Sequence, residues 1–257
     1  MNMNSIDVIA DLIRMGKFIF SSEDLRKIYN MNAQQVSRLL RKLEKSKAIR
    51  RIHRGLFILD KRFLTGIPIE IIISSLMKDK RYYLGLYTAL KYWRLVDVVL
   101  TEHFILTPER ASKTKYEIDN FKVRIIKIKD TLFFGYVKVP MNAHLVNISN
   151  TEKTILDSIY FQEYVSMRDV IKAFCRIRDK INVKKLIDYT IKFNKSSVIQ
   201  RVGYILEKLA IAKSNELKKL KEYVSKRYFW LDVKGPKIKI EKDDKWRVLC
   251  NLKVQCA

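Results

Sequence analysis

Glycine, proline and long apolar runs are scarce in this sequence of 257 residues. Only 7 glycines and 4 prolines occur, which disfavours a loop-rich fold and favours long regular elements. The most apolar run, residues 67–77, contains a proline and a glutamate and is shorter than the roughly 20 apolar residues that span a bilayer. The first 14 residues carry two aspartates and no signal-peptide core. We therefore expect a soluble, cytoplasmic protein without membrane contact.

Cysteine is equally sparse. The 3 cysteines, Cys175, Cys250 and Cys256, show no CxxC spacing and have no histidine nearby, so they do not predict a zinc site. The expectation is reduced thiols, as in most cytosolic proteins. A bond between Cys250 and Cys256 is the remaining alternative, and it would fit a hyperthermophilic source.

Motifs of catalysis are also missing. The sequence holds no P-loop, no GxGxxG and no metal-ligand cluster, and its 3 histidines are scattered at His53, His103 and His144. Glu152 and Asp157 could be a catalytic pair, but a helix turns residues five apart in different directions. Glu152 also ends a capping box that begins at Ser149. We expect no catalytic residue, no metal and no cofactor, and therefore no enzyme.

Positive charge, in contrast, is abundant. Lysine and arginine number 52 against 27 acidic residues, a formal net charge of +25. Such an excess favours a polyanionic partner, because basic side chains that neutralise phosphates release condensed counterions. A lysine-rich proteome is the alternative explanation. Since the basic residues are spread along the chain, charge alone does not locate a site.

The N-terminal pattern predicts a compact DNA-binding layout. Apolar residues at helical spacing indicate a first helix over residues 5–15, with Ser5 as its cap. Ser21 and Asp24 form a capping box at the start of a short second helix. Asn32 caps a third helix, residues 33–45, and two apolar runs around Gly55 predict a hairpin. This order is typical of a winged helix-turn-helix, whose recognition helix enters the major groove.

The outward face of the third helix carries the chemistry of base recognition. Gln34 and Gln35 can each offer a donor and an acceptor to adenine, and Arg38 can bind guanine with both guanidinium branches. Basic groups further along, and those of the hairpin, are placed to contact phosphates. The predicted DNA-binding residues are Asn32, Gln34, Gln35, Ser37, Arg38, Arg41, Lys42, Arg50, Arg51, His53 and Arg54. The alternatives are a merely solvated helix face or a winged helix that binds protein.

Patterning changes after a linker at residues 61–70, which contains Gly66 and Pro68. Helices are expected over residues 69–78 and 84–92. Between residues 98 and 148, strands rich in β-branched and aromatic residues are expected at 104–106, 123–128, 136–139 and 146–148. Helices are expected over 150–225, and strands again over 228–252. The sequence predicts an α+β, mainly helical protein with two domains, residues 1–64 and residues 65–257, which divide the labour.

Several stretches in fixed order resemble one family. They are YYLGLYTALKYW at 82–93, NTEKTILD at 150–157, RVGYILEKL at 201–209 and KDDKWRVLCNL at 242–252. Together they resemble the AbiEi antitoxins, which are also transcriptional regulators. The resemblance implies a winged-helix domain followed by a mixed α/β antitoxin domain. It also implies autoregulation of an operon that encodes a nucleotidyltransferase-like toxin, in defence against phage. The high lysine content departs from the commonest family members.

Three functional hypotheses follow. The first is a repressor that binds double-stranded DNA at an inverted-repeat operator and also antagonises a toxin. The second is a stand-alone winged-helix regulator without a toxin partner. The third, a nucleic-acid-processing enzyme, has no motif in its favour. A neighbouring gene with nucleotidyltransferase motifs would favour the first hypothesis over the second.

Overall fold

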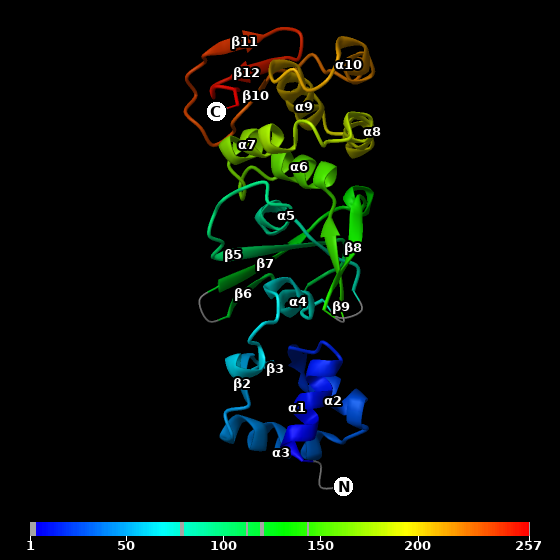
Figure 1. Cartoon of the computed structure of the whole chain (residues 1–257), viewed down its shortest axis with the longest axis vertical. Helices are drawn as coiled ribbons and strands as arrows, with labels where there is room; N and C mark the ends of the chain where they lie inside the picture. Colours follow the sequence, from blue (N-terminus) through cyan, green and yellow to red (C-terminus); the bar gives the residue numbers. More distant parts are fainter. Residues whose placement is uncertain (1–3, 78–79, 112, 119–120, 143, 257) are drawn as a thin grey trace. The chain divides into compact units, whose positions relative to one another are not determined.

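The computed structural model describes residues 4–77, 80–111, 113–118, 121–142 and 144–256. Over these residues the protein is a mixed α/β structure (Figure 1). Its helices are α1 Ser5–Arg14, α2 Ser22–Tyr29, α3 Ala33–Lys45, α4 Ile69–Ser74, α5 Leu86–Tyr92, α6 Thr151–Tyr160, α7 Met167–Ile177, α8 Val183–Phe193, α9 Ser196–Lys208 and α10 Ser214–Lys221. Its strands are β1 Ile19–Ser21, β2 Ile49–His53, β3 Leu56–Leu59, β4 Tyr83–Leu84, β5 Glu102–Thr107, β6 Lys115–Ile118, β7 Phe121–Lys127, β8 Tyr136–Met141, β9 His144–Ser149, β10 Phe229–Trp230, β11 Glu241–Asp243 and β12 Val248–Cys250.

The chain forms two compact units, each assembled from separate segments. The first comprises Met1–Tyr82, Thr101–Ile126 and Lys138–Asn147, and the second comprises Tyr83–Leu100, Lys127–Val137 and Ile148–Ala257. These units are defined by contacts and cross the predicted boundary between residues 64 and 65. That boundary, drawn from sequence patterning, stays a prediction.

The N-terminal helices begin where side chains cap them. Asn4, and not Ser5 as expected, accepts the backbone N–H of Ile6 and starts α1. The capping box of Ser21 and Asp24 is confirmed, since both of its reciprocal hydrogen bonds are present at the start of α2. These bonds satisfy amide groups that have no partner inside a helix. Each helix then buries one apolar face, as the predicted periodicity requires.

A three-stranded sheet, in the order β1-β3-β2, completes the N-terminal part of the first unit. Its pairs are antiparallel, with Phe20 opposite Phe57 in β1 and β3. These two rings are buried and stack with centroids 6.1 Å apart. Figure 1 shows α1, α2 and α3 beside this sheet. The element order is compatible with the predicted winged helix-turn-helix.

A larger sheet follows the strand order β6-β7-β5-β4-β9-β8. In the first unit, β6 and β7 pair antiparallel with Tyr116 opposite Val123. In the second, β4 and β9 are parallel, with Leu84 opposite Ile148. Strand β6 was not predicted. The helix expected over residues 69–78 ends at Ser74, and Lys78 lies outside the described residues.

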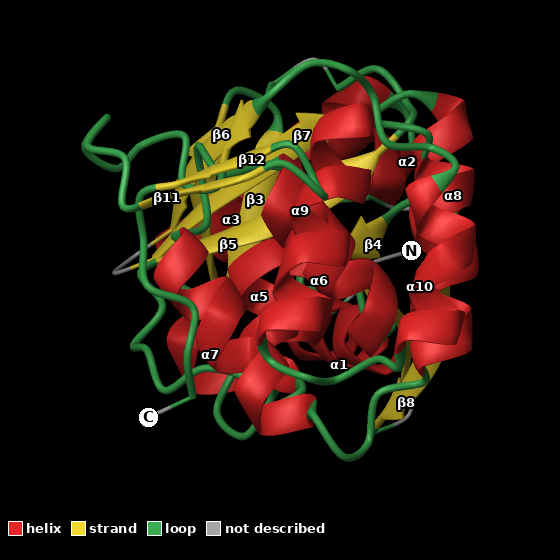
Figure 2. Cartoon of the chain, turned by 90° about the horizontal axis from the view of Figure 1, so that it is seen from above, coloured by secondary structure: helices red, strands yellow, loops and turns green. Residues whose placement is uncertain are grey.

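Helix α6 lies at the centre of the second unit. It contacts α5, α7, α8 and α9, and Figure 2 shows these helices around it. Beyond them, β12 pairs in parallel with β10 and antiparallel with β11. The buried Trp246 lies so close to Gly203 of α9 that a Cβ there would collide with its ring. No helix in the described part of the chain is long and apolar enough to cross a membrane.

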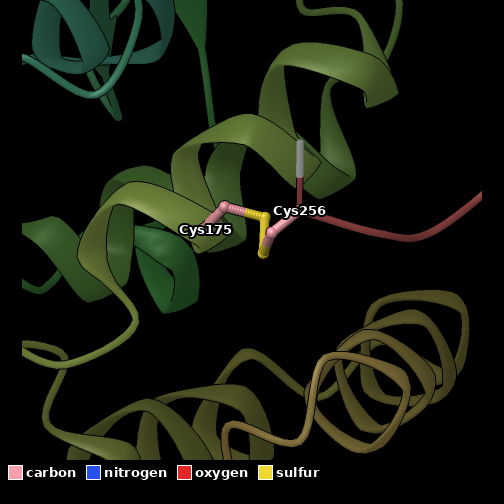
Figure 3. Close-up of a disulfide and its surroundings, with 2 residues drawn as sticks. All are labelled: Cys175 and Cys256. Carbon is pink, nitrogen blue, oxygen red and sulfur yellow. A yellow bond between two sulfur atoms is a disulfide. The ribbon is translucent and has the colours of Figure 1, made fainter.

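The cysteines correct the sequence-based expectation. Cys175 of α7 and Cys256 near the C-terminus form a disulfide, drawn in Figure 3, across a sequence separation of 81 residues. Reduced thiols were expected for both, and the alternative bond between Cys250 and Cys256 is also wrong. Cys250 is buried, and its thiol donates a hydrogen bond to the carbonyl of Leu252. Sequence spacing could not reveal this pairing, because the fold brings the two residues together.

Candidate nucleic-acid interface

Helix α3 presents its predicted DNA-binding residues on one exposed face. Its inner face buries Val36, Leu39, Leu40 and Leu43. Every predicted residue of the helix and its cap is exposed: Asn32, Gln34, Gln35, Ser37, Arg38, Arg41 and Lys42. The separation follows from helical geometry, because apolar residues every three or four positions leave the intervening ones outside.

Gln35 has a second role that sequence reasoning missed. Its Oε1 accepts the backbone N–H of Asn32 at 2.8 Å, and its own N–H donates to Asn32 Oδ1 at 3.0 Å. The two residues therefore form a capping box that starts α3. The spacing Asn-x-x-Gln is the sequence signal that could have identified it. Since the Gln35 carbonyl is already engaged, Gln34 is the better placed of the two amides for base contact.

The hairpin of β2 and β3 brings the second group of basic residues together. Gly55 has φ +70° in its turn, a conformation that favours glycine. Arg51, His53 and Arg54 are exposed, whereas Arg50 is half-buried. The imidazole Nδ1 of His53 lies 3.3 Å from the carbonyl oxygen of Arg54. A register shift between Arg51 and His53 bends β2 just before the turn.

Arg51 connects the hairpin to α3. Its guanidinium lies 3.6 Å from the carboxylate of Glu44 and over the ring of Phe57, 5.2 Å from the centroid. Glu44 is the one acidic residue between Asn32 and Leu59. Because Arg51 faces this carboxylate, little negative charge remains on the surface to repel a polyanion.

A groove of about 360 Å³ lies between α2, α3 and the hairpin. Of the predicted residues it brings together Ser37, Arg41 and Arg51, while the others lie outside its lining. Ser22 and Arg26 also line it, and neither was predicted as a site residue. Arg26 is paired with Glu23 at 3.2 Å. The groove offers hydroxyl and guanidinium donors, the groups that hold phosphate oxygens, and its two lining acids, Glu23 and Glu44, lie beside Arg26 and Arg51.

Each acid of the pair considered for catalysis, Glu152 and Asp157, forms an ion pair with a lysine. Asn150, and not the expected Ser149, caps α6, because its side chain accepts the N–H of Lys153. Glu152 is 6% exposed and forms an ion pair with Lys185 at 2.9 Å. Asp157 is bonded to Lys153, and although burial raises its pKa, that ammonium group opposes the shift. Within the described residues no cluster of histidine, cysteine or acidic side chains could hold a metal ion.

A known structure is similar in fold to most of the chain. It is the crystal structure of the RV2827C protein from Mycobacterium tuberculosis, which matches with a TM-score of 0.60 at 12% identity. The match covers 95% of this chain and 90% of that one. At this identity the likeness concerns the fold alone. None of the curated proteins compared with the chain matches it.

A family model matches the N-terminal part. Residues 7–59 match the family described as "Transcriptional regulator, AbiEi antitoxin". The predicted resemblance to the AbiEi family is thereby confirmed over these residues, the segment that contains α1, α2, α3 and the hairpin. All four stretches on which the resemblance was based, at 82–93, 150–157, 201–209 and 242–252, lie outside the match. Over these residues the chain is similar to a family of transcriptional regulators and antitoxins.

Proposed function

We propose that the protein is a DNA-binding repressor that folds its N-terminus as a winged helix-turn-helix and regulates its own operon. The observation that carries this proposal is the exposed face of α3, where amide and guanidinium groups stand beside a basic hairpin. The one acidic residue between Asn32 and Leu59 is Glu44, and its carboxylate lies 3.6 Å from the guanidinium of Arg51. The family relationship of residues 7–59 supports the same function.

In this proposal α3 lies in the major groove. Gln34 and Arg38 contact base edges, where an amide matches adenine and a guanidinium matches guanine. Arg41 and Arg51 hold phosphates from the groove between helix and hairpin, and Arg54 reaches the backbone from the turn. A second protomer on the other half of an inverted-repeat operator would supply symmetrical contacts. The protein acts in the cytoplasm, without enzymatic activity or cofactor.

The antitoxin function is the second part of the proposal. The AbiEi relationship supports a partner toxin of nucleotidyltransferase type, encoded beside this gene, and a role in phage defence. The alternative is a regulator without a toxin. Co-expression with the neighbouring gene distinguishes these two hypotheses. If the neighbouring gene alone stops growth and this protein restores it, the protein is an antitoxin, whereas normal growth with the neighbouring gene alone supports a regulator without a toxin.

The direct test is a footprint of the full-length protein on the DNA upstream of its own gene. We expect protection of one inverted repeat. Affinity should fall with salt, with a slope of log K against log salt of about −5 if about 6 phosphates are neutralised. Lys218→Ala, on the exposed side of α10, is the matched control for the removal of a positive charge. A salt-independent affinity, or no protected site, would contradict the proposal.

A further inference from the structure

A cleft of about 700 Å³ lies beside the disulfide in the second unit, a volume typical of small-molecule sites. Helix α7 forms one wall, and the C-terminal segment forms the other with Ile240. Arg168, Lys172 and Arg176 line the cleft from α7, and Asn251, Leu252 and Lys253 line it from the C-terminal segment. Figure 3 shows how the disulfide joins the C-terminal segment to this helix.

The cleft is strongly cationic. Arg168, Lys172 and Arg176 are four residues apart along α7, so they share one face at intervals of about 6 Å. Lys253 adds a fourth cation from the opposite wall, and no acidic residue belongs to the lining. Arg176 forms an ion pair with Asp97, whose side chain is 80% exposed. Arg168 and Lys172 are exposed and have no ion pair or hydrogen bond within the described part of the chain.

Aliphatic side chains lie among these cations. Ile171 is 4% exposed and belongs to the core, whereas Ile240 is 64% exposed. Leu252 is half-buried on the same wall of the cleft. An anion that also carries an apolar ring would contact both kinds of surface, because it would cover Ile240 while its charged groups meet the row on α7.

We propose that this cleft binds a phosphorylated ligand of nucleotide size, and that the bond between Cys175 and Cys256 assembles it. The site is separate from α3 and the hairpin, and the inference does not depend on DNA binding. Phosphate oxygens meet Arg168, Lys172 and Lys253, and the ring lies against Ile240 and Leu252.

The disulfide positions one wall of the site. Asn251 is anchored by its own amide, which donates to the carbonyls of Asp232 and Pro236. Residues 252–256 extend beyond this anchor, and the bond to Cys175 ties their far end to α7. Without it, Lys253 and Leu252 lose the constraint that holds them opposite the cationic row. Cys256 is exposed, so a small thiol or disulfide can reach it.

The bond forms by exchange with a small organic disulfide, RSSR. The Cys256 thiolate attacks one sulfur of RSSR and releases RS⁻, which takes up a proton. The Cys175 thiolate then attacks Sγ of Cys256, and the second RS⁻ leaves. Two protein thiols and one RSSR thus become one protein disulfide and two RSH. Excess RSH reverses both steps and opens the cleft.

Calorimetric titration of the full-length protein with ATP tests the site. We expect binding by the oxidised protein, and binding about tenfold weaker after Arg168→Ala or Lys172→Ala, since each removes a charged hydrogen-bond donor. Lys218→Ala is the control and should leave the affinity unchanged. Absence of ATP binding by the oxidised native protein, or an affinity for ATP in both cleft variants equal to that of the native protein, would overturn the proposal.

Further titrations test the ring contact and the disulfide. Inorganic triphosphate should bind more weakly than ATP, because it makes no contact with Ile240. A short single-stranded oligonucleotide that binds while ATP does not would overturn the assignment of a free nucleotide. Cys256→Ser, checked for native circular dichroism, and the dithiothreitol-reduced protein should both lose at least tenfold in ATP affinity. Unchanged affinity in both would overturn the role of the disulfide.

Discussion

Lys153 and Asp157 face each other one turn apart on α6, with their side chains 0% and 1% exposed and the ammonium bonded to the carboxylate. Tyr83 closes the arrangement, since it accepts from Lys153 Nζ at 2.8 Å and donates to Asp157 Oδ2 at 2.9 Å. The rings of Phe134 and Phe193 lie 5.2 Å from the same ammonium. Both carboxylate oxygens are thus bonded, and the ammonium donates two hydrogen bonds inside the core of the second unit.

Removal of one member of this pair should destabilise the protein strongly. Asp157→Asn leaves a buried ammonium without its counter-charge, which costs about 3–5 kcal/mol. The double variant Lys153→Met/Asp157→Asn removes both charges and should recover part of the loss, because methionine fills a similar volume without a charge. Urea unfolding followed by circular dichroism measures both. A single variant within about 1 kcal/mol of the native protein would show that the ion pair is not maintained.

The Lys153–Asp157 pair also shows how far sequence can predict. The spacing of the two residues is visible in NTEKTILD, and it indicates contact on a helix. Burial is not visible, because it depends on α5, α7, α8 and α9, which cover α6 on several sides. Sequence reasoning therefore identified the helix but not the buried ion pair within it.

Elements whose sequence signals lie within their own segment were predicted well, whereas an element that depends on pairing with another strand was not. Helix α3 was predicted over 33–45 and lies there, because its cap and apolar period are both contained in the segment. Strand β6 was missed because its residues Lys115–Ile118 are largely polar, and its pairing with β7 defines it. In the candidate site, exposure of the predicted residues followed from the period, whereas the Arg51–Glu44 contact required the fold.

Gln34 and Gln35 should separate DNA binding from stability. Gln34→Ala should weaken operator binding by about 1–3 kcal/mol, the range for a bidentate base contact, with little change in stability. Gln35→Ala should lower stability by about 1 kcal/mol, because the capping box with Asn32 is lost. Mobility-shift titration and thermal unfolding measure the two effects. The reverse pattern would show that Gln35 is the base-contacting amide.

Arg38 and Arg54 should differ in specificity. Arg38→Ala should cost about 1–3 kcal/mol on the operator and relax the preference at one base pair, because the proposed function places this side chain against base edges. Arg54→Ala, in the hairpin turn, should weaken all sequences alike and make the salt slope shallower by about one. Competition with unrelated duplexes measures the ratio of operator affinity to non-specific affinity. If Arg38→Ala leaves that ratio unchanged, α3 is not the recognition helix.

His103 should make stability depend on pH. Its side chain in β5 is 6% exposed, and within the described residues its Nδ1 has no hydrogen-bond partner. Its ring packs edge-on against Phe121, with centroids 5.7 Å apart. Burial lowers the pKa of His103 below its ordinary value of 6.5, since the interior disfavours the charged imidazolium.

The sign of the effect follows from which state binds the proton. Below about pH 6.5, His103 binds a proton in the unfolded state but stays neutral in the folded state. Because the unfolded state then holds more protons, the free energy of unfolding decreases as the pH falls. The contribution of His103 is therefore fully present above pH 6.5, and it is lost as the pH falls towards its folded pKa, by at most about 1.4 kcal/mol per pH unit. His103→Phe should keep the packing against Phe121 and remove this part of the slope. His53→Gln, at an exposed position of the hairpin, is the matched control and should leave it in place. Urea unfolding between pH 5 and pH 8 measures how the free energy of unfolding changes with pH. Identical slopes for the native protein and His103→Phe would show that folding does not lower the pKa of His103.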